Sequence, residues 1–312
     1  MQRVKLGRTG LTVSAVGLGC GGHSRLGMTS GADETNASNV VAAALDLGID
    51  FIDTARAYGT ETAVGHAIRG RRDRVVISTK ALPGGAAGLM SAAELRDSLD
   101  LSLKRLGTDY VDVFHLHGVL VDQYDHCVDV LLPELVRAQE AGKVRFIGIT
   151  ERFGVDTCHT MLASALPDNH FDVIMVGHNL INPSARHAVF PLTRKHAVGT
   201  LIMFAVRRAL TNADNVRRVV DQLIDAGAID ARGVDRSDPL GFVTSRPDVK
   251  SLIEAAYRFC RHEPGADVIL TGTGSVDHLR ENVGAILAPP LPTEIAARLN
   301  GIFGRVDSVS GD

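Results

Sequence analysis

The sequence predicts an α/β protein, a closed (β/α)8 (TIM) barrel of eight parallel strands that occupies residues 1–312 as one domain. Short β-rich runs alternate with longer amphipathic patterns, as in a parallel sheet whose strands are joined by helical crossovers. Eight such runs in 312 residues fit a barrel that usually needs about 250 residues before insertions. The apolar fraction of 45% and the charged fraction of 22% are typical of a globular chain and exclude a disordered or fibrous one.

The strands are expected where short runs rich in β-branched and apolar residues occur. In chain order they are Val13–Leu18, Ile49–Asp53, Val75–Lys80, Val111–His117, Val144–Thr150, Asp172–Val176, Thr200–Phe204 and Asp267–Thr271. The patterns between them carry helix start and stop signals. A capping box at Ser91–Glu94 opens a helix that we expect to end at Gly107, and Pro133 suits the first turn of another that closes at Gly142.

Two segments depart from the simple strand–helix alternation. Residues 5–11 predict a small N-terminal hairpin ahead of the first strand. Residues 207–266, between the seventh and eighth strands, form too long a connection, so we expect an insertion or lid there.

A doubly wound open sheet is the rival architecture, because Gly17, Gly19 and Gly22 match its GxGxxG fingerprint. Residues 23–31 have the pattern of a loop instead of the helix start that this fingerprint needs, which favours the barrel.

Charge and composition restrict the function further. The 33 basic and 36 acidic residues give a net charge of −3, without the basic excess typical of nucleic-acid binding. No apolar run approaches the ~20 residues of a membrane span, and the N-terminus has no signal-peptide core. The four scattered cysteines indicate neither a disulfide framework nor a zinc ribbon. We therefore expect a cytoplasmic enzyme or binding protein for small molecules, with no membrane or nucleic-acid partner; the oligomeric state is not predicted.

Four polar residues lie at or just after the C-terminal ends of three successive predicted strands. Asp53 ends the second strand and Tyr58 follows it, while Lys80 and His117 end the third and fourth. Strand ends of this kind form the active site of a (β/α)8 barrel, so the four side chains should share one mouth.

Together these groups suit proton transfer to a carbonyl. A neighbouring lysine favours the phenolate and should lower the pKa of Tyr58, and Asp53 would keep that lysine charged. The His117 imidazole would orient a carbonyl or relay a proton, with Tyr58 as general acid. Singly, each residue has a simpler interpretation: a structural ion pair for Asp53 and Lys80, a packed aromatic ring, or a hydrogen-bonded core histidine. Their convergence on one mouth favours the catalytic interpretation.

Further motifs follow in a fixed order. They are Leu6–Leu11, Phe51–Ala55 with Tyr58 and Gly59, Asp112 five residues before His117, Gly142–Thr150, Gly272–Gly274, and Glu281 with Asn282. With these motifs the chain resembles the aldo-keto reductase family from about residue 3 to residue 288. The resemblance implies a barrel that binds NADP(H), or NAD(H), across its mouth. It also implies direct hydride transfer between the nicotinamide and an aldehyde, a ketone or a sugar hemiacetal, with Asp53, Tyr58, Lys80 and His117 as the catalytic tetrad.

The resemblance also implies a set of cofactor contacts. They are Gly19, Cys20, Gly21, Asp53, Thr150, Glu151, Met175, Met203, Phe204, Arg207, Gly272, Thr273, Gly274, His278, Glu281 and Asn282. Several depart from the family's usual residues. Glu151 stands where asparagine is commoner and Met175 where glutamine is usual, while Gly274 and His278 replace basic residues that often bind the 2′-phosphate. We therefore expect only a modest preference between NADP(H) and NAD(H).

Two other functions stay open on the sequence alone. His115 and His117 share one face of a strand, as do histidine pairs that hold zinc in metal-dependent hydrolases on the same barrel. However, those enzymes carry the pair on the first strand with further histidine ligands on later strands, so we expect no metal site here. The second alternative is a non-catalytic nicotinamide-nucleotide sensor, a regulatory subunit on the same fold.

Overall fold

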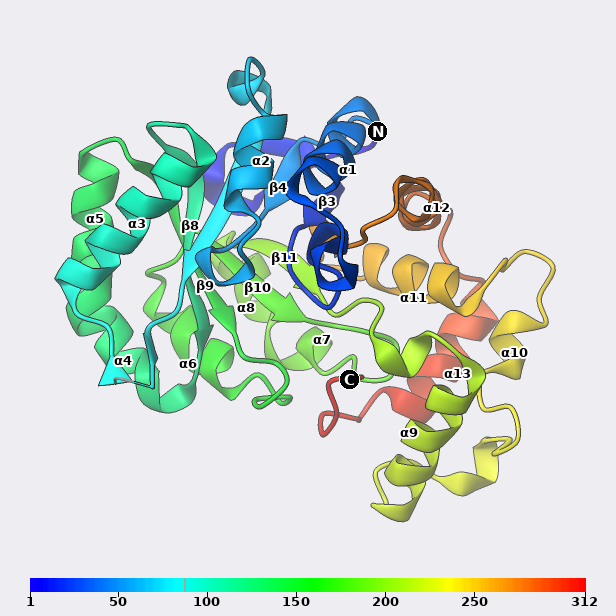
Figure 1. The fold of residues 1–312 in the computed structure, drawn as a ribbon. Coiled ribbons are helices and arrows are strands. Elements are labelled where there is room, and N and C mark those ends of the chain that lie inside the picture. The colour runs from blue at the N-terminus through cyan, green and yellow to red at the C-terminus, as the bar shows by residue number, and fades with distance from the viewer. Residues whose placement is uncertain (87) are drawn as a thin grey trace.

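The computed structural model describes residues 1–86 and 88–312, and its centre is a closed parallel barrel (Figure 1). The barrel strands are β3 (Val16–Gly19), β4 (Phe51–Asp53), β5 (Val76–Ala81), β8 (Val111–Val119), β9 (Val144–Glu151), β10 (Val173–Gly177), β11 (Gly199–Met203) and β12 (Val268–Thr271). Each pairs in parallel with its neighbours, and β12 closes the barrel onto β3. The predicted (β/α)8 fold is thereby confirmed, and the open-sheet alternative is wrong.

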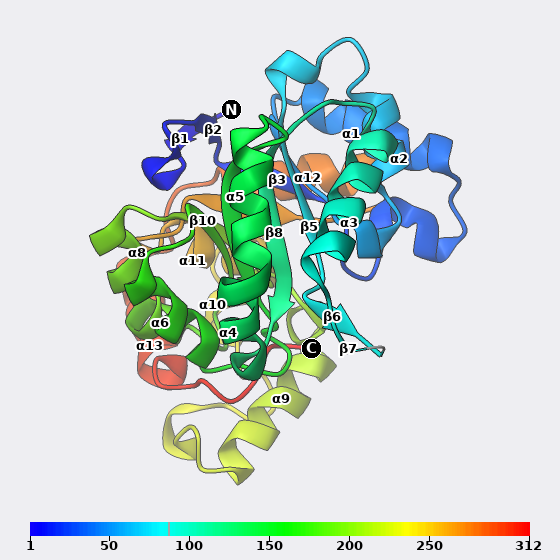
Figure 2. The same cartoon turned by 90° about the vertical axis from the view of Figure 1, so that its left-hand side faces the viewer.

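Helices surround the barrel on its outer side (Figure 2). They are α1 (Glu34–Asp46), α2 (Glu61–Ala67), α3 (Ala92–Leu106), α4 (Tyr124–His126), α5 (Leu132–Glu140), α6 (Thr160–Asp168), α7 (Ala185–Ala188), α8 (Phe190–His196), α9 (Ala213–Asp225), α10 (Gly241–Thr244), α11 (Leu252–Arg261), α12 (Val276–Ile286) and α13 (Thr293–Phe303). The predicted capping box is present at the start of α3, where Ser91 and Glu94 satisfy each other's backbone N–H groups. Within the described residues, no helix is long and apolar enough to cross a membrane.

An N-terminal hairpin lies at the end of the barrel opposite the strand C-termini. Its strands are β1 (Arg3–Lys5) and β2 (Thr12–Ser14), which pair antiparallel. Leu6, in the turn between them, is fully buried in the cluster that fills the barrel interior, with Val113 and Leu201 among its members. The hairpin therefore closes the barrel floor with an apolar side chain. The predicted strand Val13–Leu18 is wrong as a single element, because its first residues belong to this hairpin and only the remainder enters the barrel.

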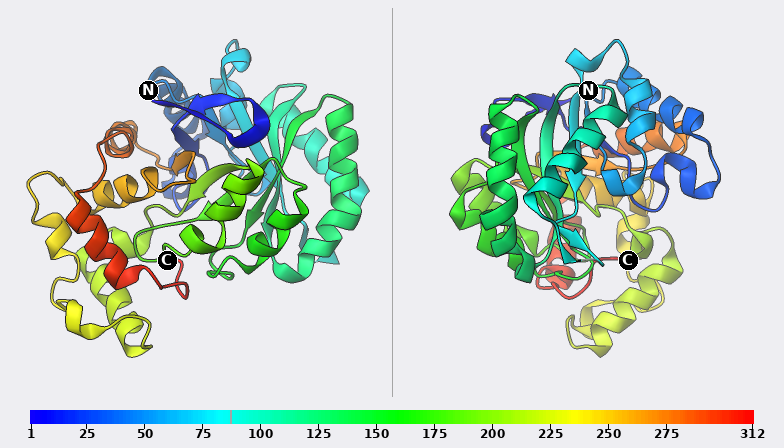
Figure 3. Two further views of the ribbon diagram at one scale, coloured as in Figure 1. Left: turned by 180° about the vertical axis from the view of Figure 1, so that it is seen from behind. Right: turned by 60° about the vertical axis from the view of Figure 1, so that its left-hand side comes forward.

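Residues 207–266 contain the helices α9, α10 and α11. Figure 3 shows this segment and α13 gathered at one side of the barrel, with the C-terminal tail returning toward the strand ends. Helix α11 packs against α12 and β12, so part of the segment belongs to the helical layer. A second small hairpin, β6 (Gly84–Gly85) with β7 (Gly88–Leu89), follows β5. The lid role and the single-domain assignment stay predictions.

Candidate active site

The four strand-end residues come together at the barrel mouth. Lys80 Nζ donates to Asp53 Oδ2 at 2.7 Å and to the Thr54 carbonyl oxygen at 2.8 Å. The same nitrogen lies 3.4 Å from the Tyr58 hydroxyl, which in turn lies 3.2 Å from His117 Nε2. A short 3-10 turn at Arg56–Tyr58, directly after β4, places the phenol over the strand ends. One hydroxyl thus sits between an ammonium and an imidazole.

The lysine and the aspartate form a buried ion pair. Lys80 is fully buried and Asp53 is 3% exposed, and Ser78 donates a second hydrogen bond to the carboxylate at 2.8 Å. Burial alone would lower the pKa of Lys80, but the charge and hydrogen bond of Asp53 raise it above the ordinary value. Lys80 is therefore a permanent cation beneath Tyr58.

The phenol and the imidazole are both neutral at physiological pH. Burial raises the pKa of Tyr58, and the opposing attraction of Lys80 is the smaller effect. The expectation that Lys80 would bring this pKa below its ordinary value is therefore wrong, because desolvation of the half-buried phenol outweighs the attraction of Lys80. Burial, with help from the charge of Lys80, lowers the pKa of His117 to about 3. Tyr58 holds a proton that it can donate, and His117 offers an uncharged hydrogen-bonding edge.

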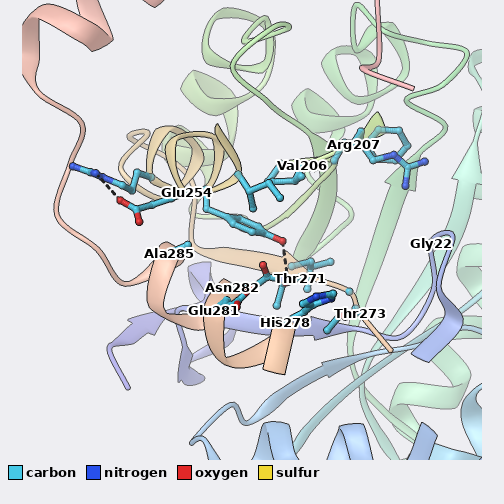
Figure 4. A pocket seen from close by; sticks show the side chains of 18 of the residues that line it. Gly22, Val206, Arg207, Glu254, Thr271, Thr273, His278, Glu281, Asn282 and Ala285 are labelled. Atoms are coloured by element: carbon cyan, nitrogen blue, oxygen red, sulfur yellow. Dashed lines mark hydrogen bonds and ion pairs between the residues drawn. The ribbon is translucent and has the colours of Figure 1, made fainter. Parts of the chain in front are cut away.

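A cleft of about 1580 Å³ runs outward from this mouth between the ends of β3, β11 and β12 and the helices α11 and α12 (Figure 4). Most predicted cofactor contacts line it. They are Gly19, Gly21, Asp53, Met175, Met203, Phe204, Arg207, Gly272, Thr273, His278, Glu281 and Asn282. At its inner end Tyr58 packs against Gly21, where an added Cβ would lie 2.5 Å from the ring. The glycine therefore gives the phenol its place at the mouth.

Four predicted contacts lie outside the cleft wall, and their contact with a cofactor stays a prediction. Cys20 is fully buried behind the wall. The Thr150 hydroxyl accepts a hydrogen bond from the Gly118 N–H at 2.6 Å. Gly274 packs against residues 26 and 27, where a Cβ would come within 2.4 Å of backbone.

The fourth of these, Glu151, has the most extensive set of buried contacts. Its side chain is fully buried, accepts a hydrogen bond from the Gly177 N–H at 2.7 Å and lies 2.9 Å from His159 Nδ1. It therefore points away from the cleft, although it follows Thr150 at a strand end as the family pattern requires. Nothing in the local sequence marks His159 as its partner.

The outer end of the cleft carries two cations that the sequence did not single out, Lys250 and Arg280. Both are exposed, and Arg280 also pairs with Asp277 on α12 at 2.8 Å. Lys250 directly precedes α11, within the long insertion, where no recognised motif could point to it. Helix α11 is fixed there because Arg258 hydrogen-bonds to Glu254 and to backbone carbonyls of the facing loop. Glu254 is labelled in the wall shown in Figure 4.

The cleft has features that suit a dinucleotide. Arg207 lines the cleft, and its buried Nε has no hydrogen-bond partner among the described residues. At Gly272 an added Cβ would lie 2.9 Å from the Gly19 carbonyl oxygen, so the glycine lets the chain after β12 approach the end of β3 closely. Ser275 caps the start of α12 beside this loop. In the described part of the chain, no three His, Cys, Asp or Glu side chains gather as a metal site.

Comparison with known proteins places this barrel among the oxidoreductases. The Aldo/keto reductase family matches residues 17–303, so the chain belongs to that family, as the motifs indicated. It is 30% identical over 316 residues to the aldo-keto reductase YhdN of Bacillus subtilis, covering 91% of this chain and 89% of the relative. It is 29% identical over 305 residues to an L-galactose dehydrogenase of Arabidopsis thaliana, covering 90% and 86%.

The fold also matches solved structures. An aldo-keto reductase from Bacillus halodurans in its holo form superimposes with a TM-score of 0.74 at 24% identity, over 99% of this chain and 98% of the other. This likeness shows the shared barrel. Family members typically bind nicotinamide cofactors and act on small carbonyl compounds.

Proposed function

We propose that this protein interconverts an aldehyde, a ketone or a sugar hemiacetal with the corresponding alcohol or oxidised sugar, with Tyr58 as the general acid or base. The observation that carries this proposal is the position of the Tyr58 hydroxyl, 3.4 Å from Lys80 Nζ and 3.2 Å from His117 Nε2 at the inner end of the cleft. A neutral, half-buried phenol beside a fixed cation is suited to giving up a proton at a carbonyl oxygen.

The cleft would hold an extended nicotinamide dinucleotide. Arg207 and the Gly272–Thr273 backbone would bind its phosphates, while Met203 and Phe204 line the inner end near Tyr58. When bound, the nicotinamide supplies or accepts the hydride. We infer that residues 207–266 cover the outer part of this cleft, because they contribute Lys250 and the N-terminal end of α11 to its wall.

The residues of the mouth would orient the substrate and transfer the proton. His117 Nε2 would hydrogen-bond the substrate oxygen and orient it toward the Tyr58 hydroxyl. As the carbonyl is reduced, its oxygen gains negative charge, and the Tyr58 O–H bond breaks to give the alcohol O–H. The resulting tyrosinate is stabilised by Lys80, whose own charge is held by Asp53 at 2.7 Å. In the oxidative direction the same phenolate accepts the proton.

The cofactor is proposed to be NADP(H), with NAD(H) also bound. No cation stands at Gly274 or His278, and the exposed Lys250 and Arg280 are available only at the outer rim of the cleft. Fluorescence titration with both reduced cofactors, followed by an aldehyde, ketone and sugar panel run in both directions, tests the proposal. The similarity to an L-galactose dehydrogenase is the reason to include aldoses in the oxidative direction.

A non-catalytic nucleotide sensor is the competing function, and the same experiment separates it. A sensor would bind reduced cofactor without oxidising it in a single turnover against any member of the panel. The intact cluster of Asp53, Tyr58, Lys80 and His117 favours the enzyme, because a sensor would have no need to bury an ion pair beneath a phenol.

A further inference from the structure

A column of stacked side chains leads from the buried core to the cleft wall. His159 lies flat against Phe153, with ring centroids 5.2 Å apart and an interplanar angle of 12°. Phe153 meets the ring of Phe204 edge to face at 5.4 Å and 88°. The guanidinium carbon of Arg207 lies 3.8 Å from the Phe204 centroid. Phe204 and Arg207 line the cleft, whereas His159 and Phe153 lie behind it.

Each end of this column is held by a carboxylate. At the buried end Glu151 lies 2.9 Å from His159 Nδ1, with both side chains fully buried. At the exposed end Asp312 accepts a hydrogen bond from Arg207 Nη2 at 2.5 Å and lies 3.4 Å from His23 Nε2. The chain around Asp312 is fixed by further bonds, including the Ala209 N–H donating to the Gly311 carbonyl oxygen at 2.9 Å.

The backbone at two members of the column is strained. His159 and Phe204 have φ of +64° and +66°, a left-handed conformation that residues with a Cβ rarely adopt. Such a conformation persists only where the surroundings hold it, and it is concentrated at functional sites. Gly177 also makes room for the column, since an added Cβ would lie 2.2 Å from the Phe153 ring.

A core packed only for stability would not need this arrangement. Burying a carboxylate and an imidazole costs desolvation free energy that apolar side chains of similar volume would avoid. The hydrogen bond to Glu151 instead fixes the plane of the His159 ring, and the stack passes that orientation to Phe153 and then to Phe204. The polar anchor therefore sets the direction of a ring in the cleft wall.

We propose that Glu151, His159 and Phe153 are positioning residues that form a strut behind the cleft, holding Phe204 and Arg207 where they face the bound dinucleotide. Asp312 holds Arg207 from the outer side. This inference rests on the proposed function, because it takes the cleft to be the dinucleotide site. It gives Glu151 a role that acts through the strut instead of through direct contact with the cofactor.

Phe153→Leu tests the strut, because it removes the stack while keeping an apolar side chain. Phe171→Leu is the matched control, since Phe171 is 3% exposed, belongs to the core and does not line the cleft. We expect Phe153→Leu to raise the Kd of reduced cofactor roughly three- to tenfold, mainly through faster release, as fits the loss of an edge-to-face aromatic contact. Phe171→Leu should lower the melting temperature of the cofactor-free protein similarly and leave Kd within about twofold of the unsubstituted protein.

The exposed end is tested by Asp312→Asn, with Asp312→Glu as the conservative variant. We expect Asp312→Asn to raise the Kd of reduced cofactor a few-fold, because Arg207 loses the partner that positions it, and Asp312→Glu to restore binding. Because both ends act on Phe204 and Arg207, the effect of Phe153→Leu with Asp312→Asn should be smaller than the product of the single effects.

Two failures are distinguishable. If Phe153→Leu lowers the melting temperature but leaves the Kd and release rate of reduced cofactor unchanged, the strut is core packing and the inference is overturned. If the unsubstituted protein binds neither reduced cofactor, the proposed function is overturned, and the inference with it.

Discussion

The buried ion pair of Lys80 and Asp53 keeps a positive charge at the mouth of the barrel. Both side chains lie in surroundings that disfavour charge, and each is compensated mainly by the other at 2.7 Å. Because Asp53 raises the pKa of Lys80, a cation lies 3.4 Å from the Tyr58 hydroxyl at physiological pH. The sequence predicted all four mouth residues, because each stands at a fixed place relative to a strand end. It did not predict how far burial outweighs Lys80 in setting the pKa of Tyr58.

Lys80→Met is the residue-scale prediction. The substitution leaves Asp53 as a buried carboxylate without a cation, so the free energy of unfolding should fall by about 3 kcal/mol. Turnover should collapse, because the tyrosinate loses the charge that stabilises it. Lys143→Met is the control: Lys143 pairs with Asp100 at 2.6 Å on the surface, and its loss should cost less than about 1 kcal/mol. Equal losses in the two variants, measured by denaturant unfolding, or undiminished turnover in Lys80→Met, would contradict this account.

At the scale of elements, short strands bounded by turn residues were predictable because burial on both faces demands continuous apolar runs. The division of the first predicted strand into two elements could not be predicted. Val13 and Val16 are both apolar and both buried, although Val13 lies in the floor hairpin and Val16 in the barrel. The strut was equally hidden. It depends on His159 reaching Glu151 through a left-handed backbone, which a histidine does not signal in sequence.

The barrel floor gives a pH prediction at this scale. Asp267, just before β12, accepts a hydrogen bond from the Thr200 N–H at 3.0 Å, and burial raises its pKa to about 6. A carboxyl whose pKa is higher in the folded chain binds its proton more tightly there. Its contribution to stability is therefore present below about pH 4 and is lost as the pH rises through about 6.

Asp267→Asn keeps a neutral side chain at all pH values and should reveal this loss. The variant should be more stable than the unsubstituted protein by about 1–2 kcal/mol at pH 8, and the difference should vanish near pH 4. Denaturant unfolding at the two pH values measures it. A variant that is less stable at pH 8 would show that the hydrogen bonds to Asp267 require its charge.

At the scale of the whole molecule, the cleft joins parts of the chain that the sequence keeps far apart. The mouth comes from β4, β5 and β8, and the outer end from α11 and α12. The mouth was predictable because it is built at strand ends, which the barrel places together. The outer end could not be predicted, because Lys250 belongs to an insertion that does not follow the repeating strand–helix pattern of the barrel.

The preference between NADPH and NADH depends on the cations at the outer end of the cleft. With only exposed cations at the outer end, the Kd values of NADPH and NADH should differ by no more than about a hundredfold, the effect of a single charge-assisted hydrogen bond. Paired titrations on one preparation measure the ratio, and Lys250→Ala should reduce it further. A thousandfold preference for NADPH would mean that Arg207, Arg208 or another cation grips the 2′-phosphate within the cleft.

Tyr58→Phe tests most directly whether the Tyr58 hydroxyl donates the proton to the substrate. The change deletes the hydroxyl and keeps the ring against Gly21. Melting temperature, affinity for reduced cofactor and turnover should be measured on one preparation. We expect nearly unchanged cofactor affinity and a fall in the turnover of carbonyl reduction by a factor of roughly 10²–10⁴, the usual contribution of a positioned general acid. Near-normal turnover with a lowered melting temperature would instead make Tyr58 a structural ring and contradict the account.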